Sequence, residues 1–226
     1  GEDGRWESEC RMSLPLTKLA NIQSDLDLLG PELELVEQYF EAADPQHESR
    51  KWEYAMALRA YDLWAQADYE RYGHANRTHG GRIADVGGAG SPFRYMMDTA
   101  LGAPIKVVDP KESTSLEQHI RYAGLCSCVF SLSVLEHVED LDQFCYHLGC
   151  LVAPGGLLFL TMDHGTDLPD EYHFHWDRKR IFDTKAWEQV REKCGEFQLF
   201  GGRDRTYHGN QVYDFSIASL ALIKRA

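Results

Sequence analysis

The chain has 226 residues, and its 36 acidic against 23 basic side chains give a formal net charge of -13. This length suits one domain of ordinary size with an appendage, and such a domain can bury a core without disulfide support. The negative charge repels a phosphate backbone, so nucleic acid is a poor partner for this chain.

The sequence shows neither a signal peptide nor an apolar run of membrane-spanning length, which predicts that the protein has no membrane partner. Its six cysteines form no C-x-x-C pair and no metal-ligand spacing, so we expect reduced thiols. Together these features predict a cytoplasmic protein. The sequence does not indicate an oligomeric state.

Two helices are predicted ahead of the first strand. Apolar residues recur at helical spacing over residues 31–43 and again over residues 49–72. The second helix contains Trp52-Glu53-Tyr54, which suits either the lining of an acceptor pocket or ordinary helix packing. Residues 1–78 are therefore predicted to form a helical cap or lid, and residues 79–226 to form the α/β core.

The strongest local signal is a glycine-rich stretch after a predicted strand. Residues 82–86 are a short apolar run that ends at Gly87, Gly88 and Gly90, which permit sharp turning and close approach of the backbone to a ligand. Ser91 stands at an N-cap position with a proline next, which predicts a helix start. Unpaired amide groups there favour a polar or anionic group over the glycines, so a nucleotide-like ligand is predicted.

Acidic residues end two neighbouring predicted strands. Asp85 precedes the glycines, and Asp109 ends the apolar run of residues 105–109. Together they suit the amine and the hydroxyl pair of one ligand, whereas either one alone suits the capping of a loop or turn equally well. A dinucleotide-binding fingerprint is not met, because Phe93 stands where the third glycine belongs.

Four motifs, in the order in which the family carries them, resemble those of class I S-adenosylmethionine-dependent methyltransferases of the type 11-like group. They are Asp85-Val-Gly-Gly-Ala-Gly-Ser91, Val-Val-Asp109, Phe130-Ser-Leu-Ser-Val-Leu-Glu-His-Val138 and Leu151-Val-Ala-Pro-Gly-Gly156. The match spans residues 80–165. It implies S-adenosyl-L-methionine as cofactor, with the glycine loop at its methionine part and Asp109 at the ribose hydroxyls. The implied cofactor site also includes Asp85, Ser131 and Ser133.

The resemblance also implies a fold, namely a Rossmann-like three-layer sandwich with a mostly parallel seven-stranded sheet, an antiparallel last strand and an N-terminal helical appendage. Only 20 residues separate Asp109 from Phe130, where the family has two helices and a strand, so a six-stranded sheet is the alternative. The apolar runs at residues 197–200 and 215–223 predict an antiparallel closing pair. The loop itself departs from the family pattern at Ala89 and Ser91, where glycine is usual.

Methyl transfer to a hydroxyl requires a group that accepts its proton, and histidine suits that task near neutral pH. The candidate catalytic residues are His137, His164 and His175, each of which also suits a structural hydrogen-bonded role. The histidine- and aromatic-rich residues 164–177 suit a polar ring such as a sugar or a phenol. We therefore predict O-methylation of a small molecule or glycan. The alternatives are methylation of a protein or nucleic acid, or a catalytically inactive subunit that binds the cofactor.

A more specific form of this hypothesis is that a bound metal ion takes part in the reaction. Five side chains are of the types that hold a divalent ion, namely those of Glu136, His137, Asp163, His164 and His175. Some quinone-biosynthesis relatives carry a metal-binding E-x-x-E-H motif at this point, but Ser133 replaces the first glutamate here. We therefore predict no metal.

Overall fold

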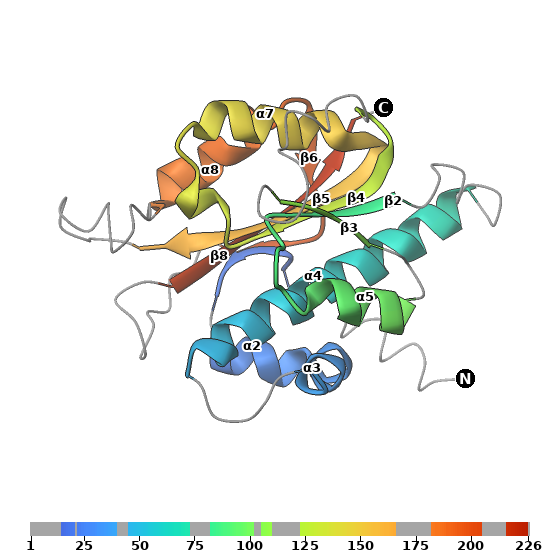
Figure 1. Cartoon of the computed structure of the whole chain (residues 1–226), viewed down its shortest axis with the longest axis vertical. Helices are drawn as coiled ribbons and strands as arrows, with labels where there is room; N and C mark the ends of the chain where they lie inside the picture. Colours follow the sequence, from blue (N-terminus) through green and yellow to red (C-terminus); the bar gives the residue numbers. More distant parts are fainter. Residues whose placement is uncertain are drawn as a thin grey trace.

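The computed structural model describes residues 15–20, 22–39, 45–72, 82–101, 105–109, 123–165, 182–204 and 216–225. Helices cover both faces of one sheet (Figure 1). One face carries α7 (Leu141–Leu151) and α8 (Thr184–Lys193), and the other carries α4 (Pro45–Tyr72) and α5 (Phe93–Leu101). The predicted three-layer α/β sandwich is therefore confirmed.

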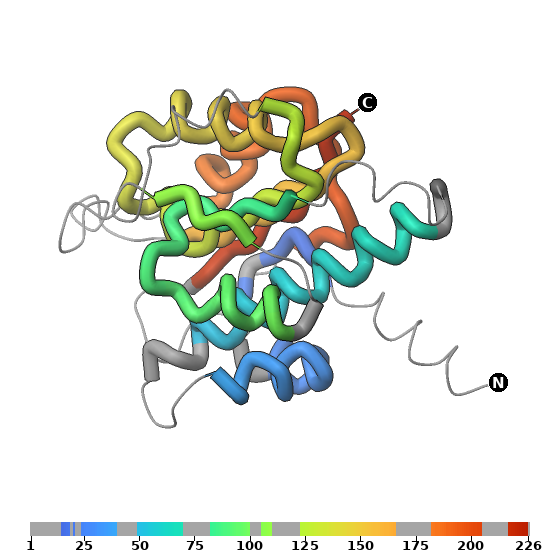
Figure 2. Tube along the Cα trace, turned by 45° about the vertical axis from the view of Figure 1, so that its right-hand side comes forward, coloured from blue at the N-terminus to red at the C-terminus, as the bar shows by residue number. Residues whose placement is uncertain are grey.

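Two short helices, α2 (Ile22–Leu28) and α3 (Gly30–Glu37), pack against α4 on the side away from the sheet (Figure 2). The buried ion pair between Arg59 of α4 and Glu32 of α3, at 3.1 Å, helps to hold them there. These helices form the N-terminal helical appendage that the sequence predicts. The proposed division of the chain between residues 78 and 79 falls outside the described residues and stays a prediction.

The sheet has eight strands within the described residues. They are β1 (Thr17–Leu19), β2 (Arg82–Val86), β3 (Ile105–Val108), β4 (Cys126–Leu132), β5 (Val152–His164), β6 (Phe197–Leu199), β7 (Arg203–Asp204) and β8 (Ser216–Lys224). Their order is β3-β2-β4-β5-β8-β1-β7, with β6 also paired to β8. Strands β2 to β5 pair in parallel, whereas β8 runs antiparallel to β5 and β6.

The mostly parallel sheet with an antiparallel last strand and the closing pair β6–β8 are therefore as predicted, but the strand count is higher than seven. Two short strands, β1 and β7, lie outside the predicted set. β1 pairs with β8 on one side and with β7 on the other, so β7 is the strand at the edge. β1 belongs to the N-terminal segment, which the sequence analysis treated as helical only, and it pairs with β8 through Lys18 and Leu19. The segment where the third strand of the family lies, residues 110–122, falls outside the described residues.

The strand order creates a topological switch point. After β2 the chain forms β3 on one side of it, and β4 then pairs with the other side. In open α/β sheets, ligands bind beyond the carboxyl ends of the strands at such a point. Residues 87–91 follow β2 and residues 133–137 follow β4, so both segments border the expected ligand position.

Strand β5 shows how the two faces of the sheet divide. Leu157 and Phe159 pack in the core cluster that includes residues of α4 and α5, whereas Leu158 and Leu160 pack in the cluster that includes residues of α7 and α8. Because side chains alternate along a strand, residues 161 and 163 belong to the α4 side, and residues 162 and 164 belong to the α8 side. This alternation decides which predicted site residues can meet.

Several predicted element boundaries change in detail. α3 ends at Glu37, before the predicted position 43, and α4 begins at Pro45, before the predicted position 49. The N-cap of α8 is Asp183, whose Oδ1 accepts a hydrogen bond from the amide of Ala186 at 2.6 Å. The N-cap of α7 is Asp140, whose Oδ1 accepts a hydrogen bond from the amide of Gln143 at 2.9 Å. Among the helices of the described ranges, none has the length and apolar character needed to cross a membrane.

Candidate active site

The glycine loop after β2 is packed so tightly that two of its positions require glycine. Gly87 has φ +85°, and a Cβ there would lie 2.4 Å from Val134 Cγ2. A Cβ on Gly88 would lie 1.9 Å from Asp85 Oδ2. The amide of Gly87 donates to the carbonyl of Val108 at 2.9 Å, which ties the loop to β3. The loop backbone is therefore held close against its neighbours, and its outer surface stays clear of side chains at these two positions.

The two predicted carboxylates lie on either side of this loop. Asp85 is 2% exposed beneath Gly88, and Asp109 is 7% exposed at the end of β3. Asp109 Oδ2 accepts a hydrogen bond from the amide of Ala89 at 3.2 Å. The structure thus brings together Asp85, Asp109 and the glycines, as the sequence predicts. The departure at Ala89 does not disturb the loop, because the backbone amide makes this contact.

The start of α5 is joined to helix α4. Ser91 Oγ accepts a hydrogen bond from the amide of Phe93 at 3.1 Å, in keeping with its predicted capping role. Its hydroxyl also shares a hydrogen bond of 2.9 Å with the hydroxyl of Tyr54, whose ring centroid lies 5.4 Å from that of Phe93. Burial raises the pKa of Tyr54, so its phenol stays protonated at neutral pH. Helix α4 is therefore in contact with the loop that follows β2.

Glu53 of α4 reaches the ends of β4 and β5. Its side chain is fully buried, and its Oε1 accepts hydrogen bonds from Ser133 Oγ at 2.5 Å and from Thr161 Oγ1. Thr161 Oγ1 in turn accepts from the amide of Ser133 at 3.0 Å, and Ser133 adopts φ 50°, which is uncommon for a residue with a side chain. Arg50 Nη1 donates to Glu53 Oε2 at 3.0 Å. These bonds fix α4 over the strand ends.

The sequence left two interpretations open for Trp52-Glu53-Tyr54, namely pocket lining and helix packing. In the structure the three residues differ in which of these they fit. Trp52 points away from the strand ends, because its Nε1 donates to Asp25 Oδ2 of α2 at 2.9 Å and its side chain is fully buried. Glu53 and Tyr54 contact the segments after β4 and β2. Trp52 therefore serves helix packing, and its two neighbours border the candidate site.

The two serines predicted for the cofactor site make contacts within the protein. Ser131 is fully buried, and its Oγ donates to the carbonyl of Val86 at 3.2 Å, which ties the end of β2 to β4. The hydroxyl of Ser133 donates to Glu53, as described above. Both serines thus shape the end of β4, and their hydroxyl hydrogens are already donated within the protein.

Arg50 is the residue at this edge that the sequence analysis missed. Glu53 raises its pKa, with smaller contributions from Glu136 and Asp163, so Arg50 is a permanent cation among acidic groups. Glu136 follows β4 and is 0% exposed, and Asp163 near the end of β5 is 3% exposed. The spacing of Arg50 and Glu53 at i, i+3 is the signal that predicts such a pair on a helix.

The candidate catalytic histidines do not gather at one place. His137 is exposed in a short 3-10 helix, Leu135–His137, directly after β4. His164 is 0% exposed on the α8 side, where its Nε2 lies 3.3 Å from Thr184 Oγ1 and its ring makes an edge contact with Trp187. Burial lowers the pKa of His164 to about 4. His175 lies outside the described residues, so His137 is the candidate next to the switch point.

Ligand-type side chains do not assemble into a metal site in the part of the chain that the structure describes. No group of three His, Cys, Asp or Glu side chains there is close enough to hold an ion.

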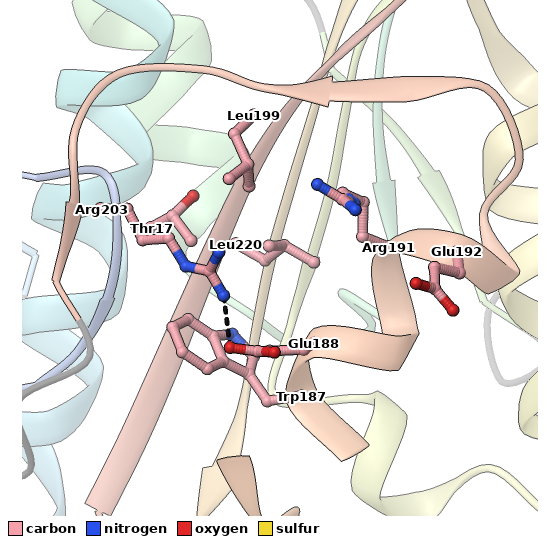
Figure 3. A pocket seen from close by; sticks show the side chains of 8 residues that line it. All are labelled: Thr17, Trp187, Glu188, Arg191, Glu192, Leu199, Arg203 and Leu220. Carbon is pink, nitrogen blue, oxygen red and sulfur yellow. Dashed lines mark hydrogen bonds and ion pairs between the residues drawn. The ribbon is translucent and has the colours of Figure 1, made fainter. Parts of the chain in front are cut away.

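A separate hollow of about 150 Å³ lies on the α8 side of the sheet (Figure 3). Trp187, Glu188 and Arg203 form part of its wall. The guanidinium of Arg203 pairs with Glu188, and its Cζ lies 5.8 Å from the centroid of the Trp187 ring. The hollow contains none of the predicted site residues, so it is distinct from the site at the strand ends.

No protein-family model and no curated protein matches this chain. Solved structures do resemble it. Phosphoethanolamine N-methyltransferase 2 of Haemonchus contortus, in complex with S-adenosyl-L-methionine, is 16% identical over 64% of this chain and 49% of its own, with a TM-score of 0.46. The chain thus spans about half the length of that protein.

Two other structures resemble most of the chain. The [4+2]-cyclase SpnF is 16% identical over 90% of this chain and 95% of its own, with a TM-score of 0.49. The carbon methyltransferase CurJ is 13% identical over 89% of this chain and 61% of its own, also with a TM-score of 0.49. Similarities at this level assign neither a ligand nor a reaction to the chain.

Proposed function

We propose that this protein is an S-adenosylmethionine-dependent methyltransferase that acts on a small-molecule or glycan hydroxyl. The observation that carries the proposal is the glycine loop at the topological switch point, held between the buried carboxylates of Asp85 and Asp109. A Cβ at Gly88 would meet the carboxylate of Asp85, so the backbone passes there as closely as glycine allows. This shape fits a nucleoside ligand that lies against the backbone.

Each part of the loop has a role in this proposal. The amide groups at the start of α5 and the glycine backbone receive the polar methionine end, and Asp109 accepts hydrogen bonds from the ribose hydroxyls. Asp85 lies beneath Gly88, where its negative charge favours the cationic ammonium. The bound cofactor supplies a methyl group activated by a sulfonium, so the protein has mainly to align the acceptor and to take its proton.

The acceptor side of the proposal rests on the segments after β4 and β5. His137 is exposed beside the switch point and is the residue we assign as proton acceptor. Glu53 is a positioning residue instead, since both of its carboxylate oxygens already accept hydrogen bonds from Ser133, Thr161 and Arg50. The buried acids Glu136 and Asp163 favour a neutral or cationic acceptor. A cytoplasmic location remains a prediction.

Calorimetric titration with S-adenosylmethionine and S-adenosylhomocysteine tests the cofactor. The wild-type protein should bind each with one-to-one stoichiometry. The variant Asp109→Asn keeps an oxygen for the amide of Ala89 but loses the charge, so its affinity should fall roughly 10- to 100-fold, as expected for lost charge-assisted hydrogen bonds.

The matched control is Asp142→Asn, because Asp142 is an acid of α7 whose side chain is 76% exposed and pairs with Lys193. Its affinity should equal that of the wild-type protein. Absence of binding by the wild-type protein would overturn the proposal. Binding without methyl transfer to any sugar or phenol would instead favour the inactive cofactor-binding subunit.

A further inference from the structure

The cationic side chain of Arg50 lies at the edge of the candidate site, and it has more hydrogen-bond donors than its bond to Glu53 uses. Its side chain is 40% exposed, and within the described residues its hydrogen-bond partner is Glu53, which takes one N–H group through Nη1 at 3.0 Å. A guanidinium has five N–H donors in a planar fork that matches a carboxylate. Most of these donors are thus left for a ligand.

Glu53 holds the guanidinium in a defined place. The carboxylate is 0% exposed and is bonded to the hydroxyls of Ser133 and Thr161, so its position relative to β4 and β5 is fixed. Burying a carboxylate is costly unless a cation and hydrogen-bond donors compensate it. Arg50 is therefore oriented before any ligand arrives, which reduces the entropy that binding would cost.

The same turn of α4 faces the glycine loop. Tyr54 lies four positions after Arg50 on the helix, and its hydroxyl is bonded to Ser91 at the start of α5. The charges of Arg50 and Asp85 both act on the pKa of Tyr54, which shows that the phenol lies within range of both groups. The first part of α4 therefore borders both the glycine loop, through Tyr54 and Ser91, and the end of β4, through Glu53 and Ser133.

The charges at this edge decide which part of a ligand Arg50 receives. Buried acids lie at or just beyond the ends of three parallel strands, namely Asp85, Glu136 and Asp163. They favour an ammonium or a sulfonium and repel a carboxylate. A zwitterionic amino-acid group is bound well only if a cation meets its carboxylate, and Arg50 is a cation close enough to Glu136 and Asp163 for their charges to raise its pKa.

We propose that Arg50 binds the carboxylate of the cofactor's methionine end, so that helix α4 of the N-terminal segment forms part of the cofactor site. This inference rests on the proposed function. It assigns to Glu53 the role of orienting Arg50, and it makes the segment before β2 necessary for full cofactor affinity.

The test is a comparison of two ligands in two proteins. Decarboxylated S-adenosylmethionine lacks the carboxylate and keeps every other group of the cofactor. Calorimetry should give the wild-type protein a Kd for this analogue roughly 10- to 100-fold higher than for S-adenosylmethionine, the range expected for a charge-assisted bidentate pair. In Arg50→Gln, which keeps a donor for Glu53, the two ligands should bind with nearly equal affinity.

Two further variants test whether the effect belongs to the guanidinium of Arg50. Arg50→Lys keeps the charge but not the planar fork, so its preference for S-adenosylmethionine should be intermediate. Lys51→Gln is the control, because Lys51 is the next residue of α4 and pairs at 3.5 Å with Glu37, which is 53% exposed. Its two affinities should match those of the wild-type protein.

The outcomes distinguish a failure of the proposed function from a failure of the role assigned to Arg50. Failure of the wild-type protein to bind either ligand would overturn the proposed function, and this inference with it. If the wild-type protein binds S-adenosylmethionine but Arg50→Gln weakens both ligands equally, or neither, Arg50 does not contact the carboxylate, and only this inference falls.

Discussion

On the α4 side of the sheet, a buried carboxylate and a guanidinium meet hydroxyl groups at the strand ends, whereas on the α8 side the last residue of β5 is a neutral imidazole packed beside an indole ring. Glu53 and Thr161 are joined on the first side, and His164 lies against Trp187 on the second. Burying charges is expensive, so a fold keeps them where other groups compensate them or where a ligand needs them. From the difference between the two faces we therefore propose that the functional site lies on the α4 side.

The largest expected effect comes from filling the space above Asp85. In Gly88→Ala the new Cβ would lie 1.9 Å from Asp85 Oδ2, so the loop or the carboxylate has to move. Affinity for S-adenosylhomocysteine should fall by roughly 100-fold or more, the scale of a misplaced binding element. The control is Gly30→Ala, where a Cβ would meet nothing within 4 Å. Equal affinities of the two variants in a calorimetric titration would contradict this account of the loop.

The fold and the shape of the glycine loop were predictable because their signals are local. A strand, three glycines and a capped helix occur in sequence, and Asp85 and Asp109 end neighbouring strands whose carboxyl ends meet at one edge. The contacts of Glu53 were not predictable in the same way. Glu53 lies 80 positions before Ser133 and 108 before Thr161, and only the packing of α4 on the sheet brings them together.

The histidines show a second limit of sequence reasoning. His164 was a candidate base because it ends a strand, where ligands bind. One position along a strand changes the face to which a side chain points, so Asp163 and His164 lie on opposite sides of the sheet. Short strands such as β1 are also hard to foresee, because three residues carry too little periodicity.

The next largest expected effect is on the pH dependence of stability, to which His164 on the α8 side contributes. Burial lowers the pKa of His164 from 6.5 to about 4. The unfolded chain therefore binds a proton to this residue below pH 6.5, while the folded protein binds it only near pH 4. The contribution of neutral His164 to the unfolding free energy is full above pH 6.5 and should be lost as the pH falls to 4, with a total of roughly 3 kcal/mol.

Urea denaturation of the wild-type protein and of His164→Gln between pH 7 and pH 4 isolates this contribution. The difference in unfolding free energy between them should change in favour of the variant as the pH falls. Cofactor affinity at pH 7 should be equal in the two proteins, because His164 lies on the α8 side. A pH-independent difference, or a large loss of cofactor affinity in the variant, would contradict the assignment of His164 to packing.

The smallest expected effect is on the unfolding free energy when one ion pair on each face of the sheet is broken. Glu53→Gln removes the buried charge that Ser133, Thr161 and Arg50 bond, and should lower the unfolding free energy by about 1–3 kcal/mol. Glu188→Gln on the α8 side breaks the more exposed pair with Arg203, and should cost less than about 1 kcal/mol. Equal costs in chemical denaturation would contradict a special role for the α4 side.

The most direct test of the central claim is a crystal structure of the protein with S-adenosylhomocysteine. We expect the ligand over Gly87, Gly88 and Gly90, with its ribose hydroxyls at Asp109 and its carboxylate at Arg50. A ligand bound instead in the hollow beside Trp187, or elsewhere on the α8 side, would contradict the claim that the charged strand ends on the α4 side form the cofactor site.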